Sequence, residues 1–123
     1  MIRGFVNTRR EAIVRLRLRG PNGVGVDVDA VVDTGCTASL TLPTATAAAL
    51  GLVLHSTGKA LLADGSAHRL DVFSAEVLWG GSWQPVLVSA VGAEVLLGMR
   101  LLAGHQLRID VVPGGLVEIL SLP

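Results

Sequence analysis

Little in this sequence supports a protein that is cross-linked by disulfides or that spans a membrane. Cys36 is its one cysteine, so no disulfide can form within the chain, which suits a reducing compartment. No apolar run approaches the length of a transmembrane helix, and residues 1–10 lack the apolar core of a signal peptide. We therefore expect a cytoplasmic protein with no membrane partner.

Net charge and aromatic content are also low. Ten basic residues balance ten acidic ones, which gives no reason to expect a nucleic-acid partner. The sequence has no tyrosine, two phenylalanines and two tryptophans, so its core must be built mainly from Val, Leu, Ile and Ala. Half of its 123 residues are apolar. We expect residues 1–123 to form a single domain that tends to self-associate.

Alternation of apolar and polar residues predicts that the chain is mostly β-strand. Residues 12–19 alternate in this way, and residues 24–32 do so again after the turn residues Gly20 to Gly23. The two segments therefore indicate a hairpin. Its first arm carries arginines at positions 15, 17 and 19 on one face, which we interpret as a solvated face because no aromatic platform for nucleic acid accompanies it.

The rest of the chain shows further short elements separated by turn residues. We expect strands at 39–42, 71–79, 83–90, 95–97, 107–112 and 116–120, a hairpin with arms 59–63 and 66–70, a helix at 44–50, and one or two helical turns at 99–104. Many short strands with at most two short helices indicate a mainly β fold, either a closed barrel or a sandwich.

Asp33 is the first candidate for chemistry. It follows the apolar Val31 and Val32, so we expect its backbone to emerge from the core, where an ionised carboxylate needs stabilisation. Thr34 offers a hydroxyl group, and Gly35 permits close approach of another backbone. The tripeptide alone favours a simple turn Asp that ends a strand, and it is the surrounding sequence that changes this interpretation.

In their order along the chain, the surroundings of Asp33 resemble the small bacterial retropepsin-like aspartic proteases of clan AA. One signature of that family is two apolar residues, Asp-Thr-Gly and a small residue, which residues 31–36 match. A second is two apolar residues and Gly before a short helix, which residues 96–98 match. A flap hairpin lies between them, at the position of residues 62–66 here. The resemblance extends from about residue 13 to residue 119.

The resemblance implies an aspartic endopeptidase built as a closed acid-protease barrel with one or two short helices. Its catalytic residue would be Asp33, in an active-site loop completed by Thr34, Gly35 and Cys36 and supported from behind by Leu96, Leu97 and Gly98. Its flap over an extended peptide or protein substrate would be formed by Ala63, Asp64, Gly65 and Ser66. Two carboxyl groups sharing one proton would activate a water molecule, with no cofactor. We also expect no metal, since His55, His68 and His105 lack ligand-like spacing.

A homodimer follows from the single copy of the signature. The chain has one Asp-Thr-Gly and about half the length of the two-lobed relatives. The second carboxyl group would therefore come from a second chain across a two-fold axis. In the family, the Thr of the signature bonds across that interface, and the resemblance gives this role to Thr34.

Two departures from the family pattern leave alternatives open. Cys36 stands where relatives carry another small residue. Its side chain is either a small buried packing group or an oxidisable switch beside the active site. Thr37 replaces an acidic residue of the retroviral enzymes, which puts the substrate contacts and dimer charge pairs at that position in doubt. A catalytically inactive module that keeps the fold for dimerisation or peptide binding is the alternative function.

Overall fold

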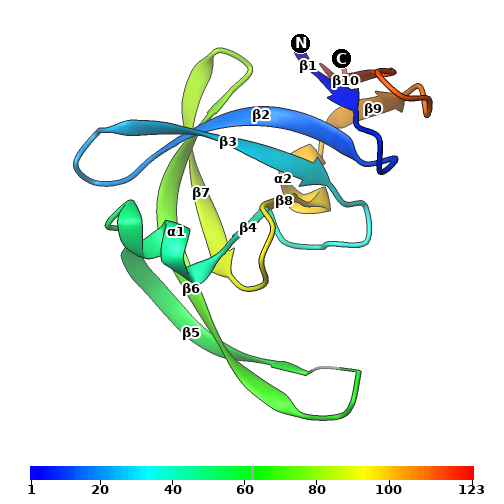
Figure 1. Cartoon of the computed structure of the whole chain (residues 1–123). Helices are drawn as coiled ribbons and strands as arrows, with labels where there is room; N and C mark the ends of the chain where they lie inside the picture. The colour runs from blue at the N-terminus through cyan, green and yellow to red at the C-terminus, as the bar shows by residue number, and fades with distance from the viewer. Residues whose placement is uncertain (62) are drawn as a thin grey trace.

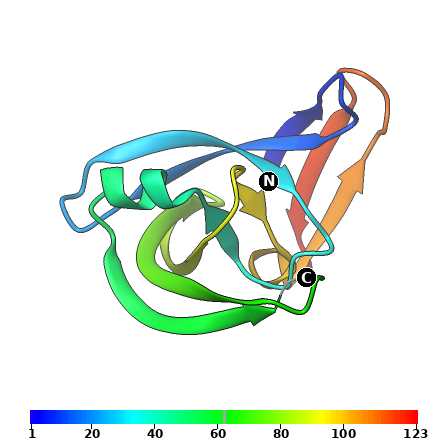
Figure 2. The same ribbon diagram turned by 60° about the horizontal axis from the view of Figure 1, so that its bottom comes forward.

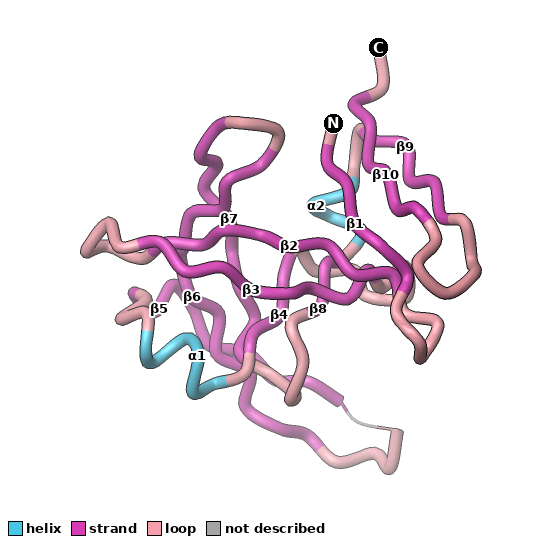
Figure 3. Tube along the Cα trace, turned by 45° about the horizontal axis from the view of Figure 1, so that its top comes forward, coloured by secondary structure: helices cyan, strands magenta, loops and turns pink. Residues whose placement is uncertain are grey.

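The computed structural model describes residues 1–61 and 63–123, and this part of the chain is mainly β-strand (Figures 1 and 3). The strands are β1 (Ile2–Val6), β2 (Ala12–Arg19), β3 (Gly25–Val32), β4 (Leu40–Leu42), β5 (Val53–Leu61), β6 (Ala67–Trp79), β7 (Ser82–Ala90), β8 (Leu96–Leu97), β9 (His105–Ile109) and β10 (Leu116–Ser121). The short helices are α1 (Thr44–Ala49) and α2 (Met99–Leu102). Within the described residues, no helix has the length and apolar character needed to cross a bilayer.

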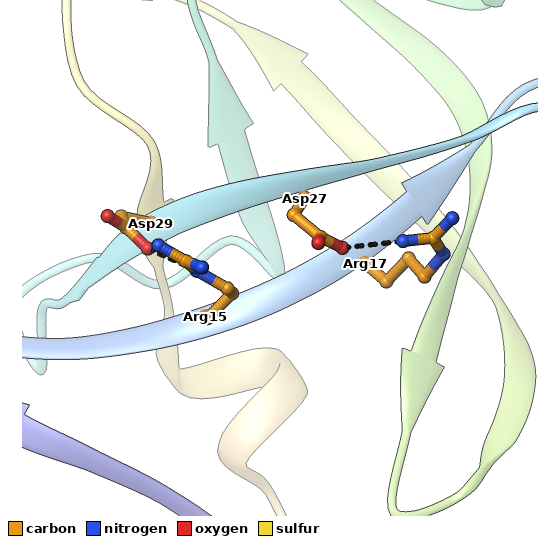
Figure 4. A network of polar contacts seen from close by, with 4 residues as sticks. All are labelled: Arg15, Arg17, Asp27 and Asp29. Carbon is orange, nitrogen blue, oxygen red and sulfur yellow. Dashed lines mark hydrogen bonds and ion pairs between the residues drawn. The ribbon is translucent and has the colours of Figure 1, made fainter.

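Strands β2 and β3 form the predicted hairpin. Leu16 of β2 is buried, whereas the neighbouring arginines point to solvent and pair across the hairpin. Arg15 binds Asp29 with 3.0 Å between nitrogen and oxygen, and Arg17 binds Asp27 at 2.9 Å (Figure 4). The prediction of a solvated arginine face is confirmed for Arg15 and Arg17, which are exposed beside carboxylates, whereas Arg19 is half-buried and pairs with Glu76 of β6 at 3.0 Å.

Six strands form a closed circuit of pairings around the core. Strand β2 pairs with β3 on one side and with β6 on the other, and the circuit between them runs through β8, β4 and β7. Figure 2 shows these strands curving around the interior. Fully buried side chains fill that interior, among them Val14, Leu18, Ala30, Leu40, Leu42, Val77, Val88 and Leu97. Aliphatic residues therefore build the core, as the composition predicts.

The hairpin formed by β5 and the first part of β6 projects away from this circuit (Figure 1). The predicted hairpin exists, but the predicted extent of its arms was wrong. Strand β5 begins at Val53, and β6 runs without interruption from Ala67 to Trp79. Strand β5 is exposed along almost its whole length, so its first half lacks the apolar alternation that marks a half-buried strand. Leu62, which the prediction assigned to this hairpin, lies outside the described residues.

Strands β1, β10 and β9 extend the sheet beyond β2 and bring the two ends of the chain together. The predicted strand at 107–112 was wrong at both ends, since β9 spans His105–Ile109. Gly115 supplies the physical reason at the C-terminal end, because a Cβ atom there would lie 1.8 Å from the carbonyl oxygen of Asp110. Residues 110–115 therefore form a tight turn that leaves Val111 and Val112 exposed, although both are apolar.

Trp79 connects the circuit to these terminal strands. It is buried at the end of β6, and its indole N–H donates to Nε2 of His105 in β9 at 3.2 Å. The two rings meet edge to face, with their centroids 5.4 Å apart. Sequence reasoning noted only that His105 lacks ligand-like spacing, whereas the structure places it half-buried in a strand and in contact with this tryptophan.

We expect Trp79→Phe to lower the free energy of unfolding by about 1–2 kcal/mol, because it removes the donor to His105 and part of a buried ring. Denaturant titration measures this loss. Trp83→Phe is the matched control, since Trp83 is only half-buried and packs against the guanidinium of Arg19, 4.0 Å from the ring centroid. Equal losses for the two variants would contradict the prediction.

Candidate active site

Asp33 is the first residue after β3, where the chain leaves the circuit. Its backbone N–H donates to the carbonyl oxygen of Leu97 in β8 at 2.9 Å. Two residues earlier, the N–H of Val31 donates to the carbonyl oxygen of Val95 at 2.8 Å. The parallel pairing of β3 with β8 therefore fixes the backbone of Asp33, while its side chain is half-buried.

The loop that follows orients the carboxylate of Asp33. The N–H of Gly35 donates to Oδ1 of Asp33 at 2.9 Å, and the N–H of Cys36 donates to its carbonyl oxygen at 3.1 Å. Among the described residues, no side chain donates to Asp33, and no Lys, Arg or His lies within ion-pair distance of it. The second carboxylate oxygen is thus available to share a proton with another carboxyl group.

The Asp33 loop, residues 33–39, is held from behind by β8 and α2. Strand β8 lies between β3 and β4, although β3 and β4 are consecutive in the chain. The N–H of Gly98 donates to the carbonyl oxygen of Ser39 at 3.0 Å, and the N–H of Met99 donates to that of Cys36 at 2.8 Å. The segment predicted to support the loop therefore lies directly against it.

Gly98 allows this close approach. A Cβ atom at position 98 would lie 2.0 Å from the carbonyl oxygen of Ala38 and 3.0 Å from that of Cys36. The φ angle of Gly98 is −99°, which any residue adopts, so the position requires glycine for lack of space and not for its conformation. The glycine of the second signature, residues 96–98, thus has a steric reason in this structure.

The middle of the Asp33 loop is open to solvent. Thr34 and Gly35 are both exposed, so a second molecule can reach them. Cys36 is half-buried, and its carbonyl oxygen is occupied by the N–H of Met99. This placement is intermediate between the two alternatives that the sequence left open for Cys36, a buried packing residue and an accessible thiol.

A hollow of about 340 Å³ lies beside Asp33. Apolar side chains from β3 and β8 line it together with the charged residues Arg10, Glu11 and Glu94. Sequence reasoning did not connect these charged residues with the site. Asn7 gives one local signal of the turn before β2 that carries Arg10 and Glu11. Its side-chain oxygen accepts the N–H groups of two residues in that turn. That turn places Arg10 at a φ of 61°, in the left-handed region.

The predicted flap residues form the turn between β5 and β6. The N–H and hydroxyl groups of Ser66 both donate to Oδ1 of Asp64, the N–H at 2.9 Å, and these bonds lower the pKa of the Asp64 carboxyl group. Its ionised form therefore contributes to the turn above the ordinary pKa of Asp, and this contribution is lost only as the pH falls through the lowered value. Gly65 has a φ of 83°, which glycine adopts without strain.

Within one chain, no side-chain hydrogen bond between residues that the structure describes joins the flap turn to the Asp33 loop. Among the described residues, the side-chain hydrogen bonds of the turn stay within it or reach His68 of β6, where Ser66 Oγ lies 3.0 Å from Nε2. What approaches the loop is the stem of the hairpin, because Val72 of β6 lines a hollow of about 250 Å³ together with Thr37 and Ser39. Ala63, beside Asp64, is exposed.

Sequence reasoning gave Thr41 no role. It lies in β4 between two fully buried leucines, and it is itself 5% exposed. A polar residue inside so apolar a strand is the signal that could have singled it out. Its hydroxyl group contacts the segment that supports Asp33.

Comparisons with known proteins agree with this geometry at the level of the fold. No family model matches the chain, and no curated protein matches it by sequence. Among solved structures, the chain is similar to the crystal structure of a retropepsin-like aspartic protease from Rickettsia conorii, with a TM-score of 0.65 and 22% sequence identity. The match covers 99% of this chain and 91% of the other. The chain therefore has a mainly β, retropepsin-like fold.

Proposed function

We propose that this chain is one subunit of a homodimeric aspartic endopeptidase of the retropepsin-like family, with residues 1–123 forming one acid-protease barrel. The observation that carries the proposal is the placement of Asp33. Its backbone is fixed by β8, one carboxylate oxygen is bound by its own loop, and the other is free of protein donors among the described residues. The similarity of the whole fold to a retropepsin-like protease supports this assignment.

The chemistry requires two carboxyl groups within hydrogen-bond distance. Two such groups do not both ionise readily, so one keeps a proton near the working pH. The ionised carboxylate removes a proton from a water molecule whose oxygen adds to the scissile carbonyl carbon, and the protonated carboxyl group donates its proton to the carbonyl oxygen. In the collapse of the resulting tetrahedral diol, the newly ionised carboxylate takes a proton from one hydroxyl group of the diol. The newly protonated carboxyl group gives its proton to the amide nitrogen, and the carbon–nitrogen bond breaks to release the amine. Because the reaction needs one protonated and one ionised group, we expect a bell-shaped pH–rate profile.

The second carboxyl group would be Asp33 of another copy of this chain. Thr34, exposed beside Asp33, would bond across the two-fold axis, and the turn Ala63 to Ser66 would close over an extended substrate. The hairpin that carries this turn projects from the rest of the chain, which leaves it free to cover a cleft formed by two subunits.

The direct test is digestion of a diverse peptide pool with the purified chain, followed by mass spectrometry across a range of pH. We expect cleavage at mildly acidic pH, between residues with apolar side chains. A pool that stays intact at every pH and at high protein concentration would refute the proposal. Retention of peptides by the intact chain without cleavage would instead favour the inactive binding module.

Dilution provides a separate test of the dimer. If only the dimer is active, the cleavage rate scales with the square of the chain concentration wherever that concentration is well below the dimer dissociation constant. A tenfold dilution should then lower the rate about 100-fold. Sedimentation analysis of the same samples should show the dimer dissociating over that range. A rate that falls in proportion to dilution, from a sample that sediments as monomer, would contradict the dimer.

A further inference from the structure

Thr41 is buried where an uncharged apolar side chain would be expected. Its neighbours Leu40 and Leu42 are fully buried, and Thr41 is the one polar residue among the buried residues of the described chain. Burial of a hydroxyl group is unfavourable unless the group is hydrogen-bonded, and no buried side-chain nitrogen or oxygen among the described residues lacks a partner. The hydroxyl group of Thr41 must therefore be explained by its bonds.

Both partners of Thr41 belong to the segment that enters β8. Oγ1 of Thr41 accepts the backbone N–H of Leu96 at 3.1 Å and lies 3.4 Å from the carbonyl oxygen of Glu94, to which it donates. A hydroxyl group both accepts and donates, so it can hold two backbone groups of one segment, here those of Glu94 and Leu96. A valine of similar size would fill the same space and make neither bond.

The opposite edge of the same segment holds Asp33. Leu97 accepts the N–H of Asp33, and Val95 accepts the N–H of Val31. Strand β8 has only two residues, and two residue pairs join it to β3 and two join it to β4. The Thr41 hydroxyl group adds two bonds to the β4 side of this short strand, whose β3 side holds the backbone of Asp33.

We propose that Thr41 is a positioning residue that fixes the Asp33 carboxylate through β8. As a statement about catalysis, this inference rests on the proposed endopeptidase activity. Two carboxyl groups that share a proton tolerate little displacement, and a shift of about 1 Å in a reacting group can cost about 100-fold in rate. The Thr41 hydroxyl group thus acts on the reaction without touching substrate.

The test compares Thr41→Val with Thr41→Ser at a temperature where both variants are fully folded by circular dichroism. We expect Thr41→Val to lower kcat about 10- to 100-fold, to leave KM within about twofold and to displace the pH–rate profile. Thr41→Ser should restore kcat to within about threefold of the unmodified chain. Val77→Ala, in the core of β6, is the control for destabilisation alone and should leave kcat and the pH profile unchanged.

Amide hydrogen exchange by NMR separates this inference from the proposed function. Thr41→Val should accelerate exchange of the Asp33 amide about tenfold or more, and Thr41→Ser should leave it near its original rate. Unchanged exchange at Asp33 in Thr41→Val, or an equal acceleration in Val77→Ala, would overturn the inference. If the unmodified chain cleaves no peptide, the proposed function fails, while the Asp33 amide still decides whether Thr41 positions that residue.

Discussion

Replacing Asp33 by Asn is expected to lower kcat for peptide hydrolysis by at least about 1,000-fold while leaving the fold intact. An amide cannot take a proton from water, and each dimer of this variant would contain two amides in place of the carboxyl pair. The structure explains why the fold should survive. Gly35 donates its N–H to the side-chain oxygen of Asp33, and an asparagine oxygen can accept that bond equally well.

Asp27→Asn is the control for this experiment. Asp27 lies on β3, the strand that leads to Asp33. It is exposed and paired with Arg17 on the outer face of the hairpin. We expect its loss to leave kcat within about twofold, because exposed ion pairs contribute little to the folded state. Cleavage by Asp33→Asn at a rate close to that of Asp27→Asn would remove Asp33 from the mechanism.

Replacing Gly98 by Ala should be among the most damaging single-methyl changes in the described residues. The added carbon would lie 2.0 Å from the carbonyl oxygen of Ala38, so either α2 or the Asp33 loop must move. The clash is with backbone atoms, so no flexible side chain can move aside to relieve it. We therefore expect a loss of about 3 kcal/mol or more in the free energy of unfolding. Denaturant titration measures the loss, and any folded fraction should have lost its activity.

Gly58→Ala is the matched variant. Gly58 lies within a strand, β5, and a Cβ atom there would meet no other atom within 4 Å. We expect this change to be neutral or to stabilise the chain by up to about 1 kcal/mol, since alanine restricts the unfolded chain more than glycine does. Similar free energies of unfolding for Gly98→Ala and Gly58→Ala would show that the Asp33 loop is not packed against Gly98 as the structure places it.

Where the sequence predicted the structure well, one local pattern determined the result. In the hairpin of β2 and β3, alternating side chains separate a buried face from an arginine face, and the turn residues fix the connection. The end of β3 at Asp33 follows in the same way, because Asp and Gly both disfavour a continuing strand. The helix after Pro43 ends near Gly51, whose φ of 62° suits the end of a helix.

Where the sequence predicted less, distant or solvent-exposed contacts determined the structure. The first half of β5 faces solvent on both sides, so no alternation marks it. Val111 and Val112 look like the end of a strand, yet a turn closed by Gly115 places them outside β9. The bonds of Thr41 join residues more than fifty positions apart, and no local pattern predicts such contacts. The partner of Asp33 belongs to another copy of the chain in our proposal, so one sequence can only imply it.

The most direct test of the account is the distance between the two Asp33 carboxyl groups in an experimental structure of the assembled protein. The proposed dyad predicts a two-fold dimer in which carboxyl oxygens of the two chains lie about 2.5–3.0 Å apart, the range of a hydrogen bond between oxygens. A dimer formed through another surface, with the two Asp33 side chains separated by the body of the protein, would contradict it.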